Sequence, residues 1–275
     1  MKASILGSSS RGNAILLSSG DSNLLLDSGL NMRKTIINLD MLGTSLDSID
    51  AVLITHCHMD HVRSLPQTGV GKEVISTPGT LHVLKEQFGS VGTKRTSLDY
   101  NQKGTVGPFT VKPFPISHDC MGQPCGFVVD DGNDRIAVAM DLGVVTEEVA
   151  RNLKGCTGLV LESNHDAGML FNSKRPPWLV NRILGPKGHL SNTECAEALE
   201  KVLDGTTDWV VLSHLSQECN NPEKAIEESK NTAMDRGAEL IVAHPTLPTR
   251  VKEGVKNEKL GQGKEGSPEA VSHMR

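Results

Sequence analysis

One short segment of the chain, 55–61, combines three histidines and an aspartate directly after the apolar run 51–54. Because residues two apart project to the same side of an extended chain, His56 and His58 are expected to address one metal ion together. Asp60 and His61 follow as the chain turns, so they are placed to address a second ion beside the first. Imidazole and carboxylate ligands suit Zn, Mn or Fe, and the lack of paired cysteines argues against a structural zinc site. The alternative is a histidine-rich surface loop.

Three further polar residues share one context, the exit from a predicted β-strand. His118, Asp141 and His214 each follow such a run. A residue at the carboxyl end of a strand stands on the rim of a sheet, where rigid backbone holds a ligand in place. Taken alone, a residue in this context is more often a capping or surface residue. Together with the histidine-rich segment they supply seven ligands, enough for two ions that share one carboxylate.

The elements that must position these residues alternate between strands and helices in each half of the chain. Apolar and alternating runs predict strands at 2–6, 13–18, 23–26, 51–54, 109–114, 126–129, 135–140, 158–161, 209–212 and 239–242. Helical spacing predicts helices at 31–42, 78–88, 177–184, 192–203 and 222–236, with loop and helix over 142–153. This order predicts an α/β fold with two sheets face to face and helices outside.

Length and composition are those of an ordinary soluble globular protein of 275 residues, with 37% hydrophobic and 22% charged residues. We expect one catalytic domain over 1–250 and a disordered tail over 251–275, where Lys, Glu, Gly and Ser dominate and apolar spacing vanishes. The six cysteines are scattered, which favours reduced thiols. The absence of a secretory signal and of any apolar stretch as long as a membrane span predicts a cytoplasmic protein without membrane contact.

Charge and aromatic content limit how the chain can bind a polymer. The net charge is −5, so a nucleic-acid partner has to be held by a local basic patch rather than by global attraction. Lys174, Arg175 and Lys187 flank the segment 188–192 and are candidates for such a patch, although each equally suits a solvated surface position. Aromatic residues make up 3% of the chain, which excludes stacking of unpaired bases on aromatic side chains as the main binding mode.

The ligand pattern resembles that of the metallo-β-lactamase superfamily, whose defining series is His-x-His-x-Asp-His followed by a His, an Asp and a final His. The resemblance covers residues 1 to about 245 and implies a four-layer αβ/βα sandwich with a dinuclear metal site at the edge between its two sheets. By this match one ion is held by His56, His58 and His118, and the other by Asp60, His61 and His214. Asp141 bridges the two ions, and Asp27 matches a buried aspartate that orients the ligand loop. The alternative for Asp27 is a turn-forming role before Ser28 and Gly29.

Four local strings place the resemblance within the superfamily. They are LGSSSRGN at 6–13, LESNHD at 161–166, GHLSN at 188–192 and LSHLS at 212–216, the last leading to NNP at 220–222. Together they resemble the WalJ/YycJ group, bacterial proteins of this fold regarded as 5′-to-3′ exonucleases on duplex DNA, and the layout is similar to that of tRNase Z. The chain lacks a long insertion that would form the tRNA-gripping arm of that enzyme. Two positions depart from the pattern, since Ser64 replaces an expected Gly and Arg11 lies in a loop that is usually small and neutral.

The chemistry implied for such a site is hydrolysis of a phosphodiester. Two divalent ions about 3.5–4 Å apart lower the pKa of a bridging water to roughly 7 and stabilise the added charge of the transition state. The leaving oxygen then needs a proton, and His189 stands where tRNase Z-like enzymes use a proton-donating His. Glu162 is expected to hydrogen-bond that imidazole and keep it protonated. We therefore predict Asp60, His189 and Glu162 as the catalytic residues; the alternative is that His189 only caps a helix together with Ser191 and Asn192.

Substrate contacts are predicted from small polar and basic residues near these motifs. Ser191 and Asn192 offer side-chain donors at a helix N-terminus, where backbone N–H groups also favour a phosphate. Arg11 lies in a Gly/Ser-rich loop whose backbone suits close approach to a phosphate, although such a turn alone is a weak signal. His165, near Glu162, suits either a substrate contact or a role in loop structure.

Four functions fit these residues, in decreasing order of support. The first is a dinuclear exonuclease that degrades duplex DNA from a 5′ end. The second is an RNA-processing nuclease with the same chemistry, because recognition of a 2′-OH leaves no trace in this sequence. The third is a small-molecule hydrolase for a lactone, thioester or cyclic nucleotide, against which the Glu162–His189 pair argues. The fourth is a non-catalytic metal-binding module, against which the intact ligand set argues. The expected cofactors are two divalent ions, Zn or Mn, with Fe as an alternative.

Overall fold

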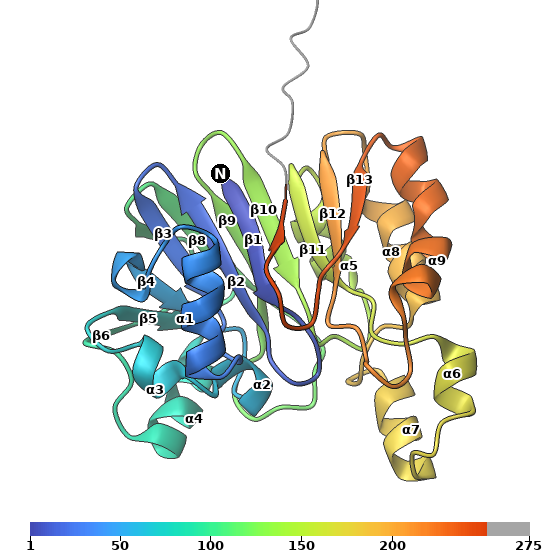
Figure 1. The fold of residues 1–275 in the computed structure, drawn as a ribbon, viewed down its shortest axis with the longest axis horizontal. Helices are drawn as coiled ribbons and strands as arrows, with labels where there is room; N and C mark the ends of the chain where they lie inside the picture. Colours follow the sequence, from blue (N-terminus) through green and yellow to red (C-terminus); the bar gives the residue numbers. More distant parts are fainter. Residues whose placement is uncertain (252–275) are drawn as a thin grey trace, which may run out of the picture.

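Two mixed β-sheets form the centre of the molecule (Figure 1). The computed structural model describes residues 1–251, so the predicted tail at 251–275 lies outside the described residues except for Val251. Within residues 1–251 the first sheet has seven strands in the order β14 (Thr249–Arg250), β1 (Lys2–Gly7), β2 (Ala14–Ser19), β3 (Ser22–Leu26), β4 (Ala51–Leu53), β5 (Glu73–Ser76) and β6 (Lys94–Ser97). The second has seven in the order β13 (Glu239–Val242), β12 (Trp209–Ser213), β11 (Gly158–Glu162), β10 (Arg135–Ala139), β9 (Cys125–Asp130), β8 (Phe109–Pro115) and β7 (Gly104–Val106).

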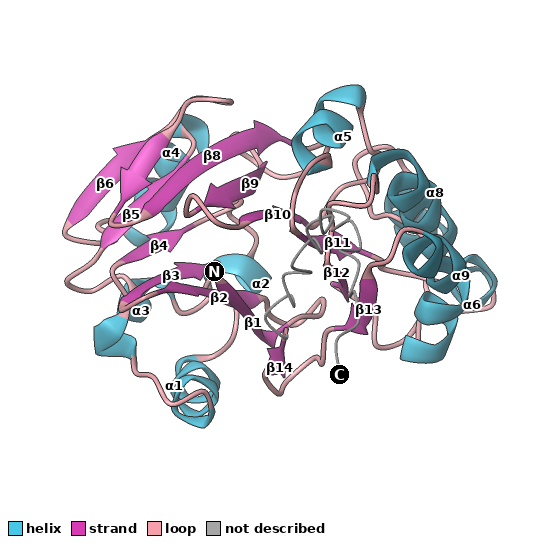
Figure 2. Cartoon of the chain, turned by 90° about the horizontal axis from the view of Figure 1, so that it is seen from above, coloured by secondary structure: helices cyan, strands magenta, loops and turns pink. Residues whose placement is uncertain are grey.

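Helices cover the outer face of each sheet (Figures 1 and 2). On the first sheet these are α1 (Met32–Met41), α3 (Leu65–Thr68) and α4 (Pro78–Phe88), and on the second α5 (Glu147–Leu153), α8 (Asn192–Val202) and α9 (Pro222–Asp235). The short helix α2 (Met59–Val62) lies instead at the end of the strands, between the two sheets in the view of Figure 2. α6 (Ala167–Phe171) and α7 (Pro177–Leu184) instead project beyond one end of the second sheet. This arrangement is a four-layer αβ/βα sandwich, so the predicted fold class is confirmed. No helix in residues 1–251 is both long and apolar enough to cross a membrane.

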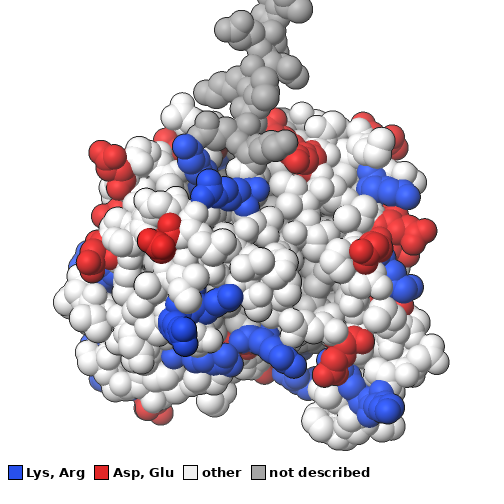
Figure 3. All heavy atoms as spheres, in the orientation of Figure 1, with Lys and Arg blue, Asp and Glu red and all other residues white. Residues whose placement is uncertain are grey.

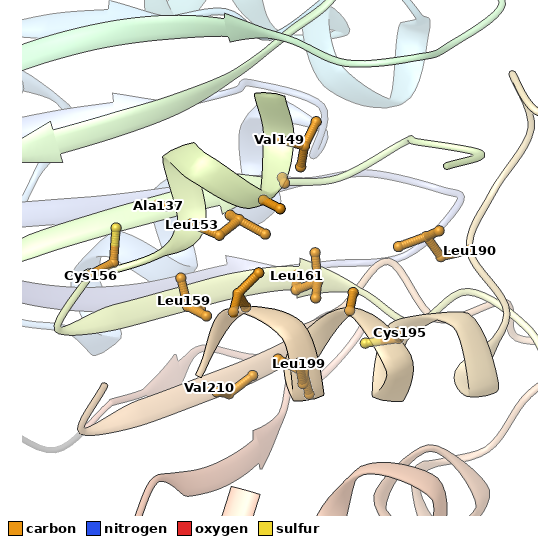
Figure 4. Close-up of a cluster of buried hydrophobic side chains, with 14 of the residues drawn as sticks. Ala137, Val149, Leu153, Cys156, Leu159, Leu161, Leu190, Cys195, Leu199 and Val210 are labelled. Atoms are coloured by element: carbon orange, nitrogen blue, oxygen red, sulfur yellow. The ribbon is translucent and has the colours of Figure 1, made fainter. Parts of the chain in front are cut away.

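Alternate residues of the strands point to opposite faces, and both faces are buried. In β1, Ile5 packs between the two sheets, whereas Leu6 packs beneath the helices of the first sheet. In β10, Val138 faces the other sheet, while Ala137 belongs to the apolar cluster beneath α5 and α8 (Figure 4). Because both faces are buried, these strands read as continuous apolar runs in the sequence. The packing on both faces makes the strand ends rigid supports for the residues that follow them.

The predicted elements agree with the structure over most of the chain, and the differences fall on short or edge elements. α4 and α7 begin and end at the predicted residues, and the predicted ends of β1 and of β8 to β12 are each within one residue of those observed. β5, β6, β7 and β14 are absent from the prediction. β6, with the sequence KRTS, is mostly exposed and therefore carries no apolar pattern. α2, α3 and α6 have four or five residues, too few for a helical period to be read.

Candidate metal centre

The predicted ligands meet at one edge of the sandwich, just beyond the ends of the strands. Asp27, Asp141 and His214 follow β3, β10 and β12 and have φ angles of 62°, 57° and 56°. Among the non-glycine residues of 1–251, only Asn101 shares this left-handed conformation. It costs about 1–2 kcal/mol per residue, so it persists where the surrounding structure demands it. Three of the four non-glycine residues of 1–251 with this conformation are therefore predicted site residues, and they meet at this sheet edge.

His56, His58 and His118 bring ring nitrogens within 4.8 Å of one another. Nδ1 of His58 lies 3.1 Å from Nε2 of His118. Nδ1 of His56 lies 3.1 Å from the hydroxyl of Thr55, while its Nε2 is buried without a hydrogen-bond partner among residues 1–251. The group therefore gathers imidazole nitrogens close enough to bind one cation, with Nε2 of His56 unpartnered among residues 1–251, as a site with three imidazole ligands requires.

Asp60, His61 and His214 form a second group. Oδ2 of Asp60 lies 3.4 Å from Nε2 of His214 and 3.6 Å from Nε2 of His61. Oδ2 of Asp141 lies 2.8 Å from Nε2 of His61. Its Oδ1 lies 3.5 Å from Nε2 of His214 and 3.8 Å from Nε2 of His118. The structure thus brings the seven predicted ligands together, with the Asp141 carboxylate between two sets of three.

These contacts leave polar atoms unsatisfied in a way that suits bound cations. The facing nitrogens of His58 and His118 can share at most one proton. Oδ2 of Asp141 approaches His61 closely but has no partner with hydrogen-bond geometry in the described part of the chain. A buried polar atom without a partner costs about 1–3 kcal/mol, and coordination of a cation offsets that cost. The donor set therefore fits two divalent ions of the kind that imidazole and carboxylate bind.

Two buried carboxylates fix which nitrogen of two ligand histidines faces the centre. Oδ2 of Asp27 lies 2.7 Å from Nδ1 of His61, and Oε1 of Glu162 lies 2.9 Å from Nδ1 of His214. In each ring Nδ1 donates to the carboxylate, which leaves Nε2 for a cation. Asp27 also accepts hydrogen bonds from the N–H and hydroxyl of Thr55. Asp27 thereby ties the start of the histidine-rich segment to the end of β3.

Burial controls the protonation of the first group. It lowers the pKa of His56, His58 and His118 below the usual value of a histidine. These rings are therefore neutral at physiological pH, which is the form that binds a metal ion.

The second group is dominated by neighbouring charges. Burial lowers the pKa of His61, but the charges of Asp141, Asp27 and Asp60 outweigh it and raise the pKa well above the usual value. Burial raises the pKa of Asp141, but the charges of His214 and His61 outweigh it and hold the pKa well below its usual range. A cation that binds here displaces a proton from His61, so its affinity rises with pH.

His189 lies beside the ligands and is held by Glu162. Its Nδ1 is 2.8 Å from the same Oε1 that binds His214, so the predicted hydrogen bond is present. The other oxygen, Oε2, accepts from the backbone N–H of Leu142, which holds the carboxylate in place. Burial lowers the pKa of His189, but the charge and hydrogen bond of Glu162 raise it above the usual value. The residue that caps α8 is Ser191 rather than His189.

The predicted substrate contacts differ in how they are presented. Arg11 is exposed, whereas Ser191 is buried, and its hydroxyl accepts from the N–H of Glu194 as the cap of α8. Asn192 is also buried, and its side-chain amide is bonded to other side chains. His165 is 1% exposed, and neither ring nitrogen has a hydrogen-bond partner in the part of the chain that the structure describes. In this structure, Arg11 is the member of the set that reaches solvent freely.

Three buried side chains contact the ligands, and the sequence analysis missed them: two hold the backbone of His214, and Asn13 lies at the His61 nitrogen that faces the centre. Nδ2 of Asn13 lies 3.0 Å from Nε2 of His61. The backbone of His214 is held at both ends: its carbonyl accepts from Asn164 at 2.8 Å, and its N–H donates to the hydroxyl of Ser8 at 2.8 Å. All three residues belong to the strings 6–13 and 161–166. The Asn and Ser residues inside these strings were the only signal in the sequence, and a sequence does not show which way a side chain points.

Gly29 lies against the backbone of the ligand segment. A Cβ added there would stand 1.5 Å from the carbonyl oxygen of Asp60 and 2.7 Å from the nitrogen of His61. No side chain fits this gap, which explains the glycine two residues after Asp27. Ser64, which departs from the expected Gly, has φ of −100° and therefore needs no left-handed backbone.

An open pocket of about 330 Å³ leads from solvent to the centre. It is lined by Ser10, His58, Met59, Asp60, Asp141, Arg182, His189 and His214. Arg182, on α7, makes two hydrogen bonds of 2.5 and 2.8 Å to the carboxylate of Asp119, the residue after His118. Figure 3 shows basic side chains gathered along this lower part of the molecule. The pocket therefore combines the ligand groups, the His189 ring and a cation at its rim.

Comparisons with known proteins agree with the resemblance to the metallo-β-lactamase superfamily. Residues 22–215 match the model of the "Beta-lactamase superfamily domain". The chain is 27% identical to the exodeoxyribonuclease YycJ of Bacillus anthracis over 90% of this chain and 97% of that protein. It is 31% identical to the exodeoxyribonuclease WalJ of Streptococcus pneumoniae over 82% of this chain and 85% of that protein.

Solved structures share the fold. The Zn²⁺-bound PqqB of Methylobacterium extorquens superposes with a TM-score of 0.68 at 20% identity, covering 91% of this chain and 100% of that one. Human tRNase Z, short form, gives a TM-score of 0.62 at 15% identity, covering 90% and 98%. The predicted similarity in layout to tRNase Z is therefore present in the fold.

Proposed function

The chain belongs to the metallo-β-lactamase superfamily, and from this premise we propose that it is a dinuclear metal-dependent phosphodiesterase, a 5′-to-3′ exonuclease on double-stranded DNA. The observation that carries the proposal is the Glu162–His189 pair, hydrogen-bonded at 2.8 Å beside both ligand groups. Acyl hydrolysis can rely on the metals and an oxyanion contact alone, whereas a phosphodiester also needs a proton for its leaving oxygen. The names of the YycJ and WalJ relatives support DNA as the polymer.

Seven residues hold the cofactor in this proposal. His56, His58 and His118 would hold one divalent ion and Asp60, His61 and His214 the other, and the Asp141 carboxylate, which lies between these groups, would serve both. Zn and Mn both suit these donors, and Fe is the alternative. When bound, the two ions supply an activated water and stabilise the negative charge of the transition state. Asp60 lines the pocket, so its carboxylate also borders the reacting phosphate.

His189 is the general acid of this mechanism. Glu162 fixes Nδ1 of the ring, so Nε2 is the atom that gives a proton to the leaving oxygen. After that transfer, the Glu162 charge favours return of a proton to the ring. Because Oε1 of Glu162 also holds His214, one carboxylate sets the distance between the acid and a metal ligand.

The substrate backbone is held by local positive charge rather than by the chain as a whole. Arg182 lines the pocket, and Arg11 is exposed on the loop before β2. The guanidinium groups of Arg11 and of Arg182, the latter also paired with Asp119, neutralise phosphates without reading sequence in this proposal. Ser191 caps α8, the helix after His189, and the backbone N–H groups of that N-terminus are the proposed partners of a phosphate. These contacts suit a protein that shortens DNA irrespective of its sequence.

A cleavage assay on end-labelled linear duplex DNA and a matched RNA, with Mn or Zn added, tests the proposal. Progressive loss from the 5′ end of the DNA, absent in Asp141→Ala, supports the exonuclease and its direction. Cleavage of the RNA alone would show that the same residues serve an RNA-processing nuclease instead. If the fully metallated protein cleaves neither polymer, the nuclease is excluded and a small-molecule ester, or no catalysis, replaces it.

A further inference from the structure

The chain leaves two of its few aromatic side chains in solvent. It has five Phe, two Trp and one Tyr. Six of these rings are buried or half-buried in the sandwich, whereas Phe171 and Trp178 are 68% and 67% exposed. Both lie in the segment that projects beyond the second sheet, here called the α6–α7 lobe and comprising residues 167–187 (Figure 1).

The two rings are not needed for the packing of the lobe. Leu170 and Ile183 form its small apolar cluster with Cys219, and Met169, Leu179 and Val180 pack against that cluster. Trp178 stands at the second position of α7 and Phe171 at the last of α6, outside the cluster. Large exposed rings on a lobe that already has its own apolar contacts indicate a surface that binds something.

The charge of the lobe identifies the class of ligand. Residues 167–187 contain Lys174, Arg175, Arg182 and Lys187 and no aspartate or glutamate, in a chain whose net charge is −5. Arg175 and Arg182 are paired with Glu218 and Asp119 outside the lobe, so Lys174 and Lys187 carry its unbalanced charge. Positive charge tracks a phosphate backbone, and aromatic rings stack on unpaired bases; the two together are the elements of a surface for single-stranded nucleic acid. The low aromatic content of the whole chain argues against stacking as the main binding mode, so any stacking is confined to this one place, where both exposed rings lie.

The lobe is joined closely to the metal centre. Trp178 and Arg182 are four residues apart in α7, so they lie on the same side of the helix, one turn from each other. Arg182 lines the pocket together with Asp60 and His189. A strand whose phosphodiester lies in the pocket therefore has neighbouring nucleotides within reach of Trp178.

The base of the lobe is packed tightly against the loop after Asp141. A Cβ at Gly143 would stand 2.5 Å from the carbonyl oxygen of Gly185, and one at Gly188 would stand 2.1 Å from that of Ile183. Such close backbone approach fixes where α7 ends relative to Asp141 and His189. The lobe is thus held at a set position beside the pocket.

From these contacts we propose that the α6–α7 lobe binds unpaired bases of the substrate strand by stacking on Trp178 and Phe171, with its basic residues on the backbone. This rests on the proposed nuclease function and makes it more specific: the preferred substrate has a single-stranded 5′ end, which reaches the centre across the lobe.

Intrinsic tryptophan fluorescence offers a direct test, because the only other tryptophan, Trp209, is 7% exposed in β12. Addition of a single-stranded oligodeoxynucleotide to the metal-loaded protein is expected to quench the fluorescence of Trp178. Its affinity is measured in parallel by anisotropy of a labelled strand. Trp178→Ala is expected to weaken binding roughly 5- to 150-fold, the effect of losing one stacked base, and Phe171→Ala to weaken it in the same direction. Trp178→Phe keeps a ring and is expected to retain most of the affinity while losing the quench.

Leu184→Ala, on the same helix, serves as the matched control, since it removes an exposed apolar side chain that is not aromatic. Unchanged affinity in both alanine variants, or an equal loss in Leu184→Ala, overturns the proposal. A change of oligomeric state in Trp178→Ala reassigns the surface to a contact between copies of the chain. The cleavage assay on blunt duplex distinguishes failure of the lobe proposal from failure of the proposed nuclease function. If the lobe variants bind the single strand as the wild type does and still cleave, the nuclease function is retained and the lobe has no role in substrate binding. If the wild-type protein neither binds the strand nor cleaves DNA, both the nuclease function and the lobe proposal are wrong.

Discussion

Oδ2 of Asp27 lies 2.7 Å from Nδ1 of His61, so a residue 34 positions earlier in the chain decides which nitrogen of a proposed ligand faces the metal centre. Asp27 reaches this position through a left-handed backbone turn at the end of β3. It also accepts from the N–H of Thr55, which begins the histidine-rich segment. One carboxylate therefore orients both a ring and the backbone that carries its neighbours.

Asp27→Asn is expected to weaken metal binding about 10- to 100-fold, the usual cost of removing an outer partner of a ligand histidine. Asparagine keeps the size of the side chain but removes the charge that holds the Nδ1 proton of His61. Metal affinity is measured by competition with a chelator of known affinity. Asp40→Asn, on the exposed side of α1, is the control and should bind metal as the wild type does. Equal affinity in both variants contradicts the orienting role.

Two substitutions are expected to distinguish residues that bind metal from the residue that transfers a proton. Asp141→Ala should lose metal and activity together, because its carboxylate lies between the two ligand groups. His189→Ala should retain both ions and lose turnover by about 10²- to 10⁴-fold, the usual contribution of a general acid. The check is metal content by elemental analysis beside single-turnover cleavage rates. A His189→Ala protein with full activity removes this residue from the mechanism.

Gly29→Ala is expected to lower the free energy of unfolding by about 1–3 kcal/mol or more and to reduce metal content. The added Cβ would overlap the carbonyl of Asp60, so the ligand segment has to move. Thermal unfolding with and without metal measures the effect. Gly168→Ala is the matched control, because the nearest atom to its Cβ is a side-chain oxygen of Asp166 at 3.3 Å. Similar losses in both variants would show that the position of Gly29 is not special.

That the seven proposed ligands meet could be predicted from sequence because their spacing is local or tied to strand exits. The segment 55–61 carries four ligands in one string, and an apolar run precedes each of His118, Asp141 and His214. α4 and α7 were predicted to the residue because each begins at a proline, at Pro78 and Pro177. These signals depend on neighbouring residues only, which a single sequence displays.

The remaining features depend on pairs of residues that are far apart in the chain. The gap that excludes a side chain at Gly29 is made by Asp60, and the carbonyl of His214 is held by Asn164, 50 positions away. β5 and β6 are short strands whose place comes from pairing with their neighbours rather than from their own apolar pattern. Long-range partners of this kind leave no periodic signal in one sequence.

His165 provides a test of burial through pH. Burial lowers the pKa of this ring, which is 1% exposed and has no hydrogen-bond partner for either nitrogen within residues 1–251. A histidine with a lowered pKa in the folded state binds its proton more readily when unfolded, where its pKa is about 6.5. Stability from this residue is therefore present above that pH and is lost as the pH falls from about 6.5 toward the folded value.

His165→Leu is expected to be at least as stable as the wild type at pH 7.5 and to lose less stability between pH 7.5 and 5.5. Leucine removes both the proton uptake on unfolding and the two unpaired ring nitrogens. Denaturant unfolding of the metal-loaded proteins at both pH values gives the difference. His82→Leu, at an exposed position on α4, should leave the pH dependence as it is. Parallel pH profiles for His165→Leu and the wild type would mean that the ring gains a partner in solution. The cleavage rate of the same variant then separates the two roles that the sequence analysis left open for His165, a substrate contact and a role in loop structure.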